Sequence, residues 1–422
     1  MATIDTRAKA VIYPAHTVSG YGHIYSLGLA GVGVTALSPV NCGNFRSRYV
    51  REKFIVPDPC VNHERFVEWL VCYGGNQETK PVLFMAEDLY SYIASLYQER
   101  LKPFFHFSYV PLEKLDILFN KFAMYRTAMA AGLKVPHGLF QPISRKELDA
   151  WPCYPAVVKP VVSRFKFKGM QLLSVCSFQH LFDGKAIFAS NPMDLWNLAG
   201  RLQDADVEFC VQEYIPGDNS NLFTVYFVAD RNGNIPSYST HYKVRQFPAD
   251  FGTTSVSQSE AVPQLRVYAE QFCKHAGYTG PATMEFKLSA RDGNWYLMEI
   301  NPRLGFAVRR STIKGVNMVL QQYLLSTGQR LLASRQRDSG RCWIDIPGDI
   351  KGLLWRRKKK QWRLSNWQIF KPYFFFSEAI FNLKDPVPGL ARLKTSLLRA
   401  LQGRTRQSAL VRDKRLRINT AG

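Results

Sequence analysis

The sequence predicts a protein of mixed α/β and α+β class with a basic extension at its C-terminal end. Short apolar strands alternate with amphipathic helices over residues 8–110, a pattern typical of a parallel sheet covered by helices. Residues 222–303 contain longer segments that alternate polar with apolar residues around Asn-Gly and Asp-Gly turns, as antiparallel hairpins do. From residue 351 onward, 18 lysines and arginines stand against three acidic residues, so this end carries +15 of the net charge of +22.

Composition limits the class of protein further. A chain of 422 residues is long enough for two or three domains, and 46% hydrophobic with 13% aromatic residues indicates a folded protein. The eight cysteines are dispersed without a Cys-x-x-Cys pair, which argues against structural zinc and a disulfide framework and favours the cytoplasm. Residues 11–45 lack Asp, Glu, Lys and Arg, but six glycines and two prolines interrupt them, so we expect a buried strand, loop and helix there instead of a membrane span.

The first 110 residues are expected to form an open α/β layer. KAVIYPA predicts a first strand, SGYGH a glycine turn, and IYSLGLAGVGVTALS a helix that runs into a second strand. KFIVPDP predicts a third strand, HERFVEWLVCYGG an amphipathic helix, and KPVLFMAEDL a fourth strand that leads into another helix. Such a parallel sheet has a crevice at the carboxyl ends of its strands. The glycines at 20, 22 and 28 do not match G-x-G-x-x-G, so no dinucleotide site is predicted.

Three charged residues near this layer have ordinary structural interpretations. Glu87 and Asp88 lie where the fourth strand meets its helix, a place where substrates often dock, but acidic residues there more often cap the helix and we expect a cap. Lys121 lies in a helix-and-turn segment over residues 112–136, where an exposed lysine is the default expectation.

A second lysine is harder to explain by structure alone. Lys159 stands near the end of the apolar strand CYPAVVKPVV, and because burying an unpaired lysine is costly, we expect its ammonium group to meet an anion. The following segment, SRFKFKGM, adds Arg164, Lys166 and Lys168 beside Gly169. It is either a loop that covers a phosphate or the tip of a basic hairpin, and the residues favour neither.

Two further segments carry candidate binding groups. FCVQEYIPG is an apolar strand that breaks at Pro216, and free backbone groups at such a break suit the donor and acceptor on the edge of adenine. Asp218 and Asn219 follow, where a tight turn and a ribose contact are both open. Lys243 and Arg245 lie two apart on one strand, hence on one face, and suit a phosphate or a carboxylate.

The hairpin over residues 280–303 carries the most specific pattern. Glu299 and Asn301 share a strand face, and Glu285 joins them only if the register pairs it with Glu299. A two-residue loop at the Asp-Gly turn would pair Glu285 with Ile300, so we expect an odd loop or a bulge. Two carboxylates and an amide then form an oxygen set suited to Mg²⁺ together with substrate phosphates. Taken alone, the same pattern also fits a solvated sheet face.

The order of these motifs resembles that of the ATP-grasp superfamily. NKF with Lys121, YPAVVKP with Lys159, QEYIPGDNSN, YKVRQFPADFG and MEF…MEINPR follow one another at plausible spacing. Among subgroups, the chain is similar to D-aspartate ligase and to carboxylate-amine ligase-like proteins of polysaccharide biosynthesis. The resemblance implies a Rossmann-like pre-ATP-grasp domain over residues 1–110, an ATP-grasp domain over 111–335 with a small lid at about 140–215, and a basic, aromatic-rich, partly helical extension over 336–422.

The resemblance also implies roles for individual residues, with ATP and Mg²⁺, or Mn²⁺ in its place, as cofactors. The metal ligands would be Glu285, Glu299 and Asn301. Arg303 would stabilise the transferring phosphoryl group or the tetrahedral intermediate, with Lys243 and Arg245 as further ligands of substrate or phosphate. The nucleotide would be bound by Lys121, Lys159, Gln212, Glu213, Tyr214, Ile215, Asp218 and Asn219. Many members have a glycine-rich or serine-rich loop at this position, whereas SRFKFKGM has a single glycine. The resemblance therefore gives weaker support for a mobile, phosphate-binding loop here than for the other motifs.

The function implied is ligation of a carboxylate to an amine through an acyl phosphate, with small-molecule substrates, in cell-envelope or exopolysaccharide metabolism. A phosphoryl transfer needs positioning and cations, and the sequence supplies lysines and arginines without a Ser-His-Asp or Cys-His set. The alternatives are a kinase of the same fold and a nucleotide-binding regulator recruited to membranes by its basic tail. The oligomeric state is not indicated by the sequence.

The tail over residues 340–422 combines cations with aromatic and leucine residues. WRRKKKQWR places five consecutive cations between tryptophans, and LARLKTSLLRALQGR predicts a basic amphipathic helix with leucines at 390, 393, 397, 398 and 401. This pattern favours an anionic membrane surface, which would place the protein at the inner face of the membrane. An extension packed on the rest of the protein by its leucines is nearly as well supported, and nucleic-acid binding is the weakest of the three alternatives.

Overall fold

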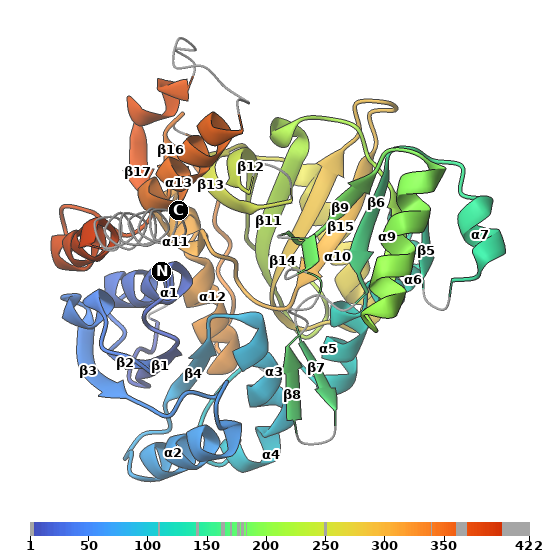
Figure 1. The fold of residues 1–422 in the computed structure, drawn as a ribbon. Coiled ribbons are helices and arrows are strands. Elements are labelled where there is room, and N and C mark those ends of the chain that lie inside the picture. Colours follow the sequence, from blue (N-terminus) through green and yellow to red (C-terminus); the bar gives the residue numbers. More distant parts are fainter. Residues whose placement is uncertain are drawn as a thin grey trace, which may run out of the picture.

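The computed structural model describes residues 4–108, 110–140, 143–161, 178, 181–182, 184–248, 251–338, 340–359 and 369–398, together with the backbone of 165–168 and 171–174. Figure 1 shows a small sheet with its helices in the N-terminal part, a long twisted sheet at the centre, and a second small sheet beside it. Within the part of the chain described, every helix is too short or too polar to cross a bilayer.

The N-terminal part is built on a parallel four-stranded sheet, as expected from the alternating pattern. Its strands lie in the order β3-β2-β1-β4. They are β1 (Ala10–Tyr13), β2 (Val34–Ser38), β3 (Val50–Ile55) and β4 (Val82–Met85). The helices around them are α1 (Val18–Leu29), η1 (Gly43–Arg46), α2 (His63–Gly75), α3 (Asp88–Leu96) and α4 (Gln98–Leu101).

The expected glycine turn at SGYGH is wrong, because these residues form the first turns of α1. The helix starts after Thr17, whose hydroxyl accepts a hydrogen bond from the Gly20 N–H at 3.0 Å. A Cβ on Gly20 would lie 2.1 Å from the carbonyl oxygen of Pro14, and one on Gly22 would lie 2.7 Å from a Val308 methyl group. The glycines therefore serve close packing of the helix, a use that local sequence rules do not separate from a turn.

A second small sheet is antiparallel and has the order β5-β10-β6-β9. Its strands are β5 (Gly138–Phe140), β6 (Ala156–Pro160), β9 (Ile187–Ala189) and β10 (Phe209–Glu213), covered by α7 (Arg145–Asp149) and α9 (Pro192–Asp204). A separate hairpin pairs β7 (Phe165–Lys168) with β8 (Gln171–Ser174). Helices α5 (Leu112–Phe119) and α6 (Lys121–Ala130) precede this sheet in the chain.

The central sheet has seven strands in the order β15-β14-β11-β12-β13-β16-β17. These are β11 (Leu222–Ala229), β12 (Tyr238–Phe247), β13 (Thr253–Ser259), β14 (Gly280–Leu288), β15 (Trp295–Asn301), β16 (Cys342–Ile344) and β17 (Phe376–Glu378). The helical elements attached to it are η2 (Asn219–Asn221), α10 (Pro263–Ala276), α11 (Val308–Ile313), α12 (Met318–Ser326), α13 (Ile346–Lys358) and η4 (Lys371–Tyr373). The main core lies where α5, α6 and α10 pack on one face of this sheet, which leaves the other face for the site.

The described part of the C-terminal extension packs on the rest of the protein, which was one of the three alternatives drawn from the sequence. Strands β16 and β17 continue the central sheet, and Trp343, Ala379 and Ile380 are buried against Tyr21 of α1. The buried carboxylate of Asp385 accepts hydrogen bonds from the hydroxyls of Tyr21 and Ser47 at 3.0 and 2.6 Å.

The leucines are not what holds the extension in place. Residues 386–398 form the expected helix, but Leu390, Leu397 and Leu398 on it are exposed. Leu401 and Lys360, the last of the five consecutive cations, lie outside the described residues.

Candidate active site

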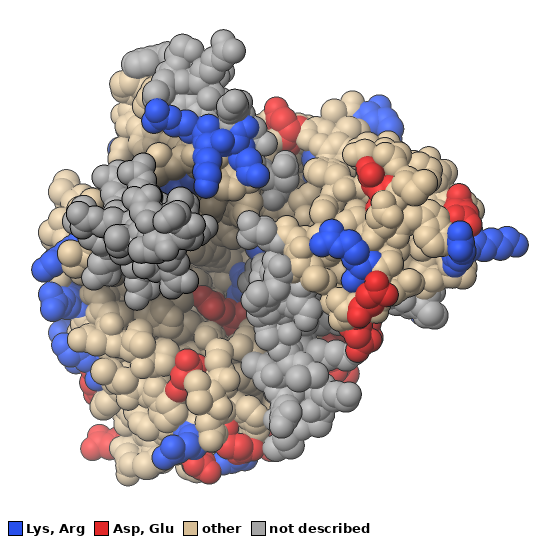
Figure 2. Space-filling model, viewed as in Figure 1, with Lys and Arg blue, Asp and Glu red and all other residues tan. Residues whose placement is uncertain are grey.

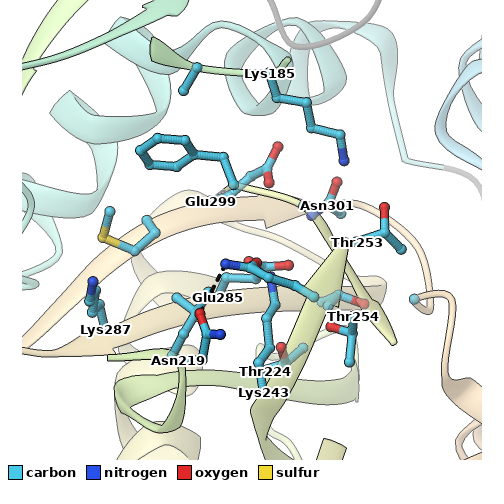
Figure 3. Close-up of a pocket in the computed structure, with 18 of the residues that line it drawn as sticks. Lys185, Asn219, Thr224, Lys243, Thr253, Thr254, Glu285, Lys287, Glu299 and Asn301 are labelled. Atoms are coloured by element: carbon cyan, nitrogen blue, oxygen red, sulfur yellow. Dashed lines mark hydrogen bonds and ion pairs between the residues drawn. The ribbon is translucent and has the colours of Figure 1, made fainter. Parts of the chain in front are cut away.

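A cavity of about 1030 Å³ lies between the second small sheet and the free face of the central sheet. It reaches Ser19, Ala86 and Glu87 of the N-terminal part, so all three parts of the fold meet there. Figure 2 shows a hollow near the middle of this face of the molecule, and Figure 3 shows the polar side chains that point into the cavity.

The predicted register of the 280–303 hairpin is confirmed. Glu285 of β14 lies opposite Glu299 of β15, and Asn301 lies opposite Thr283, so the two carboxylates and the amide line the cavity together. The register depends on a bulge at Met298, because Phe286 already pairs with Leu297. The loop itself spans six residues, 289–294, an even number that alone would pair Glu285 with Met298, so the bulge is what places Glu285 opposite Glu299.

This oxygen set fits a hard divalent cation. Within the described residues no cluster of three His, Cys, Asp or Glu side chains forms a closed metal site. Two carboxylates and an amide make an open set, which suits Mg²⁺ held jointly by protein and phosphate oxygens. The Lys243 ammonium group lies 3.1 Å from the Glu285 carboxylate and forms an ion pair with it.

Lys243 and Arg245 do not share one face, and this expectation is wrong. A bulge at Val244 shifts the pairing, so that Lys243 lies opposite Ser257 and Arg245 opposite Val256. Lys243 lines the cavity, whereas the Arg245 guanidinium is buried in an ion pair with Asp349 of α13, at 2.6 Å. Simple alternation could not show this, because a bulge reverses the side of every residue that follows it.

Lys121 is buried rather than exposed, which corrects the default expectation for a helical lysine. Asn120 caps α6 by accepting from the N–H groups of Phe122 and Ala123, so Lys121 is the first residue of the helix and lines the cavity. Lys159 lies close by on β6, where burial and the positive charge of Lys121 lower the pKa of its ammonium group to about 8. An anion between the two lysines would relieve both effects.

The segment that follows β10 also lies along the cavity. Gln212, Glu213, Tyr214 and Ile215 all line it, and the Gln212 Nε2 atom is buried with no hydrogen-bond partner among the described residues. The Glu213 carboxylate accepts from the backbone N–H of His137 at 2.9 Å and pairs with Arg291 at 3.2 Å. These contacts fix the end of the strand, so the groups that face the cavity are positioned in advance.

Asp218 and Asn219 form the tight turn, one of the two alternatives that the sequence left open, and the ribose contact stays a prediction. The Asp218 carboxylate accepts from the backbone N–H and the hydroxyl of Ser220, which lowers the pKa of Asp218 and fixes the turn. Asn219 accepts a hydrogen bond from the Gln246 amide at 3.0 Å, and both Asp218 and Asn219 line the cavity.

Asp88 does not cap its helix. The N-cap residue Glu87 makes no side-chain capping bond, and Asp88 instead forms an ion pair with Arg303 at 2.7 Å, with the Asp88 side chain buried and the Arg303 side chain 12% exposed. Asp88 thereby holds Arg303 beside Asn301, whose amide oxygen lies 3.4 Å from the guanidinium. A partner 215 residues away in the chain gives no local sequence signal.

Several cavity residues had no signal of their own in the sequence. They come from separate segments that only the fold brings together, although His241 could have been found from its position two residues before Lys243 on the same strand face. Arg164 lies outside the described residues, and for Lys166 and Lys168 only the backbone is described, so the role of that loop stays a prediction. The missed residues include Lys185, Thr224, Tyr226, His241, Gln246, Phe251, Thr253, Thr254, Lys287 and Arg356.

Comparison with known sequences finds similarity over part of the chain. Residues 228–334 match the family model of the carbamoyl-phosphate synthase L chain, ATP binding domain. D-aspartate ligase from Enterococcus faecium is 24% identical over 294 residues, which cover 65% of this chain and 66% of that protein. The similarity therefore spans just under two thirds of this relative.

Solved structures share the fold at low sequence identity. N5-carboxyaminoimidazole synthetase from Staphylococcus aureus gives a TM-score of 0.62 at 15% identity, covering 85% of this chain and 87% of that one. L-amino acid ligase from Bacillus licheniformis gives 0.54 at 14% identity, covering 77% and 75%. The biotin carboxylase domain of a Hydrogenobacter thermophilus carboxylase, solved with MgADP and bicarbonate, gives 0.59 at 16%, covering 80% and 73%.

Proposed function

We propose that the chain is an ATP- and Mg²⁺-dependent ligase of the ATP-grasp type that joins a carboxylate to an amine. The match of residues 228–334 to an ATP binding domain and the similarity to D-aspartate ligase support this proposal. The carboxylate oxygen attacks the γ-phosphorus of ATP and ADP leaves, which gives an acyl phosphate. The amine then attacks the acyl carbon, inorganic phosphate leaves, and the amine loses a proton to give the amide. Phosphorylation makes the second step feasible because phosphate is a far better leaving group than an oxide.

The observation that carries this proposal is the alignment of Glu299 and Glu285 across two strands, with Asn301 on the same surface and Lys243 beside them. We assign Glu285, Glu299 and Asn301 to the cation, which when bound would neutralise developing charge on the phosphates. Lys121 and Lys159 would hold the phosphates, and Arg303, fixed by Asp88, would stabilise the phosphoryl group or the tetrahedral adduct.

The nucleotide end of the site is assigned to the second small sheet. Gln212, Glu213, Tyr214 and Ile215 would contact adenine, with the unpartnered Gln212 Nε2 atom as an added donor, and Asp218 or Asn219 would face the ribose. We propose that the sheet within residues 140–215 acts as the lid of an ATP-grasp domain over 111–335, and that residues 1–110 contribute to the substrate end.

The test is turnover of the purified full-length chain with a panel of carboxylates and amines, beginning with D-aspartate. ADP release is followed by a coupled assay, and the product is identified by mass spectrometry. Glu299→Gln is expected to lower turnover by about 100-fold or more, by analogy with the loss of one well-placed stabilising group. Exposed Glu208, changed to Gln, is the matched control. Near-normal turnover by Glu299→Gln would remove the metal assignment.

The product separates the proposed reaction from its alternatives. An amide supports ligation, a phosphate ester identifies a kinase, and nucleotide binding without turnover identifies a regulator. Similarity to D-aspartate ligase favours the first, and from that similarity we propose a role in cell-envelope or exopolysaccharide metabolism.

We also propose that the C-terminal extension contacts an anionic membrane surface. Phe374 and Phe375 are 68% and 50% exposed, and the Arg341 guanidinium lies over the Phe375 ring at 4.4 Å. Figure 2 shows basic side chains gathered above the hollow, where Figure 1 places α13. Aromatic rings beside cations suit the headgroup region. In vesicle flotation, the full chain should float with anionic vesicles and not with neutral ones, and Phe374→Ser with Phe375→Ser should abolish flotation. Flotation indifferent to lipid charge would exclude this contact.

A further inference from the structure

A row of side chains crosses the central sheet from the proposed metal ligands to a buried arginine. Glu299 pairs with Glu285, Glu285 with Thr224, Thr224 with His241, and His241 with Ser259, each on the neighbouring strand. Residues paired in this way lie on the same face of the sheet. His241 lines the cavity two strands away from Glu285, at a distance on the order of 10 Å.

Resting on the proposed ligase function, we infer that His241 donates a hydrogen bond from Nε2 to the acyl substrate and that Arg310 is the positioning residue that fixes this tautomer. Arg310 of α11 is 1% exposed, and its Nη2 contacts the His241 Nδ1 atom. A guanidinium has donors only, so Nδ1 must accept and the ring proton must stand on Nε2. Nε2 is then the ring nitrogen left for a ligand in the cavity that His241 lines.

The surroundings of Arg310 are unusual for a buried cation. None of the described carboxylates forms an ion pair with it, and its other hydrogen bond runs from Nη1 to the Ser259 hydroxyl at 2.5 Å. Burial lowers the pKa of Arg310 to about 10, so it is still charged at neutral pH. A buried charge held only by a histidine and a hydroxyl is costly if its sole use is to fill the core. The cost is explained if the arginine orients a functional histidine.

The charges that face His241 keep its ring neutral. Burial, Arg310 and Lys243 all lower the pKa of His241 well below its ordinary value. Tyr226 packs against the ring from β11 at 5.1 Å between centroids, and burial raises the pKa of Tyr226 to about 12, so it brings no negative charge. Glu285, the nearest acid in the row, is paired with Lys243. A neutral imidazole can donate without giving up a proton, as a stabilising donor requires.

The position of His241 along β12 favours the acyl substrate over the nucleotide. Gln246, Lys243 and His241 line the cavity in this order, and Gln246 lies at the end where Asn219 is assigned to the ribose. His241 lies at the other end, beside Tyr226. Gly305 packs closely on the Tyr226 ring, since a Cβ added to Gly305 would lie 2.7 Å from a ring carbon. Helix α11, which carries Arg310, packs against α1 where Gly22 meets Val308, and Ser19 of α1 lines the cavity, so this end borders the N-terminal part. The Nε2 hydrogen would meet the carboxyl oxygen that is not phosphorylated and that regains negative charge when the amine adds.

The first test reads the tautomer and needs no turnover. Full-length protein labelled with ¹⁵N-histidine is expected to show, for the signal lost in His241→Gln, an unprotonated Nδ1 and a protonated Nε2 throughout pH 6–8. In Arg310→Met the same ring should exchange between tautomers, whereas His275→Gln on the exposed side of α10 should leave it unchanged. A protonated Nδ1 in the unaltered protein would overturn the inference, whether or not the protein is a ligase.

The second test reads which ligand the ring meets. D-aspartate, as the acid probe, is expected to shift the His241 Nε2 signal, whereas MgADP alone should leave it in place; a shift with MgADP alone would assign His241 to the nucleotide and refute the acyl contact. In turnover with whichever acid supports ADP release, His241→Asn should lose about 100-fold to 1000-fold in kcat. His241→Gln, whose amide nitrogen can reach the Nε2 position, should retain more activity, with MgADP affinity equal in both variants. Equal losses in the two variants would contradict a donor at Nε2.

Discussion

Loss of the buried Asp349 carboxylate should strongly destabilise the protein. Asp349 accepts four hydrogen bonds: two from the Arg245 guanidinium at 2.9 and 2.6 Å, one from the Ser255 hydroxyl at 2.8 Å and one from the Tyr373 hydroxyl at 2.5 Å. The Arg245 and Asp349 side chains are only 10% and 2% exposed. Asp349→Ala leaves a buried, uncompensated cation, which costs about 3–5 kcal/mol.

That loss is measurable as a fall in Tm of roughly 6–20 °C for a domain of the size formed by this sheet. Differential scanning calorimetry of Asp349→Ala, Arg245→Met and the double variant forms a closed cycle. The double variant Arg245→Met, Asp349→Ala should recover much of the stability lost in Asp349→Ala, because removing both charges leaves no uncompensated one. At a temperature where each variant is folded, turnover should stay near that of the unaltered protein. If Arg245→Met loses more than tenfold in activity at a temperature where it is folded, Arg245 acts in catalysis.

Three further expectations concern the site and its frame. Asp88→Asn should free Arg303 and lower kcat by about 10-fold to 100-fold with little change in KM for ATP, as measured by ADP release. The pKa of Lys159 is lowered to about 8, and phosphate binds the protonated ammonium group more tightly, so MgATP affinity should fall as pH rises through 8. Lys159→Arg should remove this pH dependence in calorimetric titrations. The same dependence of affinity on pH in Lys159→Arg would refute the assignment. Gly20→Ala should destabilise by about 1–3 kcal/mol in urea titrations, whereas Gly33→Ala, which meets no atom within 4 Å, should be near neutral.

The sequence was sufficient where chemistry demanded one arrangement. Glu285, Glu299 and Asn301 could share a surface only with an irregular register, so the bulge in the 280–303 hairpin was predictable from the residues it aligns. The parallel N-terminal sheet followed from the alternation of apolar strands with amphipathic helices, which has few other solutions.

The sequence was insufficient where a long-range partner decides the outcome. Arg245 follows a bulge that no residue type marks, and its partner lies 104 residues later. Asp88 lies where a cap is expected but forms an ion pair with Arg303. Lys121 is buried where the start of its helix meets the second small sheet, since its backbone N–H donates to the carbonyl of Val161 after β6. The glycines in α1 predict a turn from sequence alone, because the segments that pack against them are not visible in the sequence.

The strands that close the central sheet come from the far end of the chain, and this sets an order for biosynthesis. Until residue 344 has left the ribosome, β13 has an open edge where β16 will later pair, and β17 then pairs with the outer edge of β16. An open edge is a template for other strands, so the nascent protein is exposed to aggregation longest at this point. A chain cut after residue 335 would keep that edge permanently, together with the cavity left by Trp343. A chain that includes β16 and β17 is therefore expected to aggregate less than one cut before them, even though the proposed catalytic groups end at Arg303.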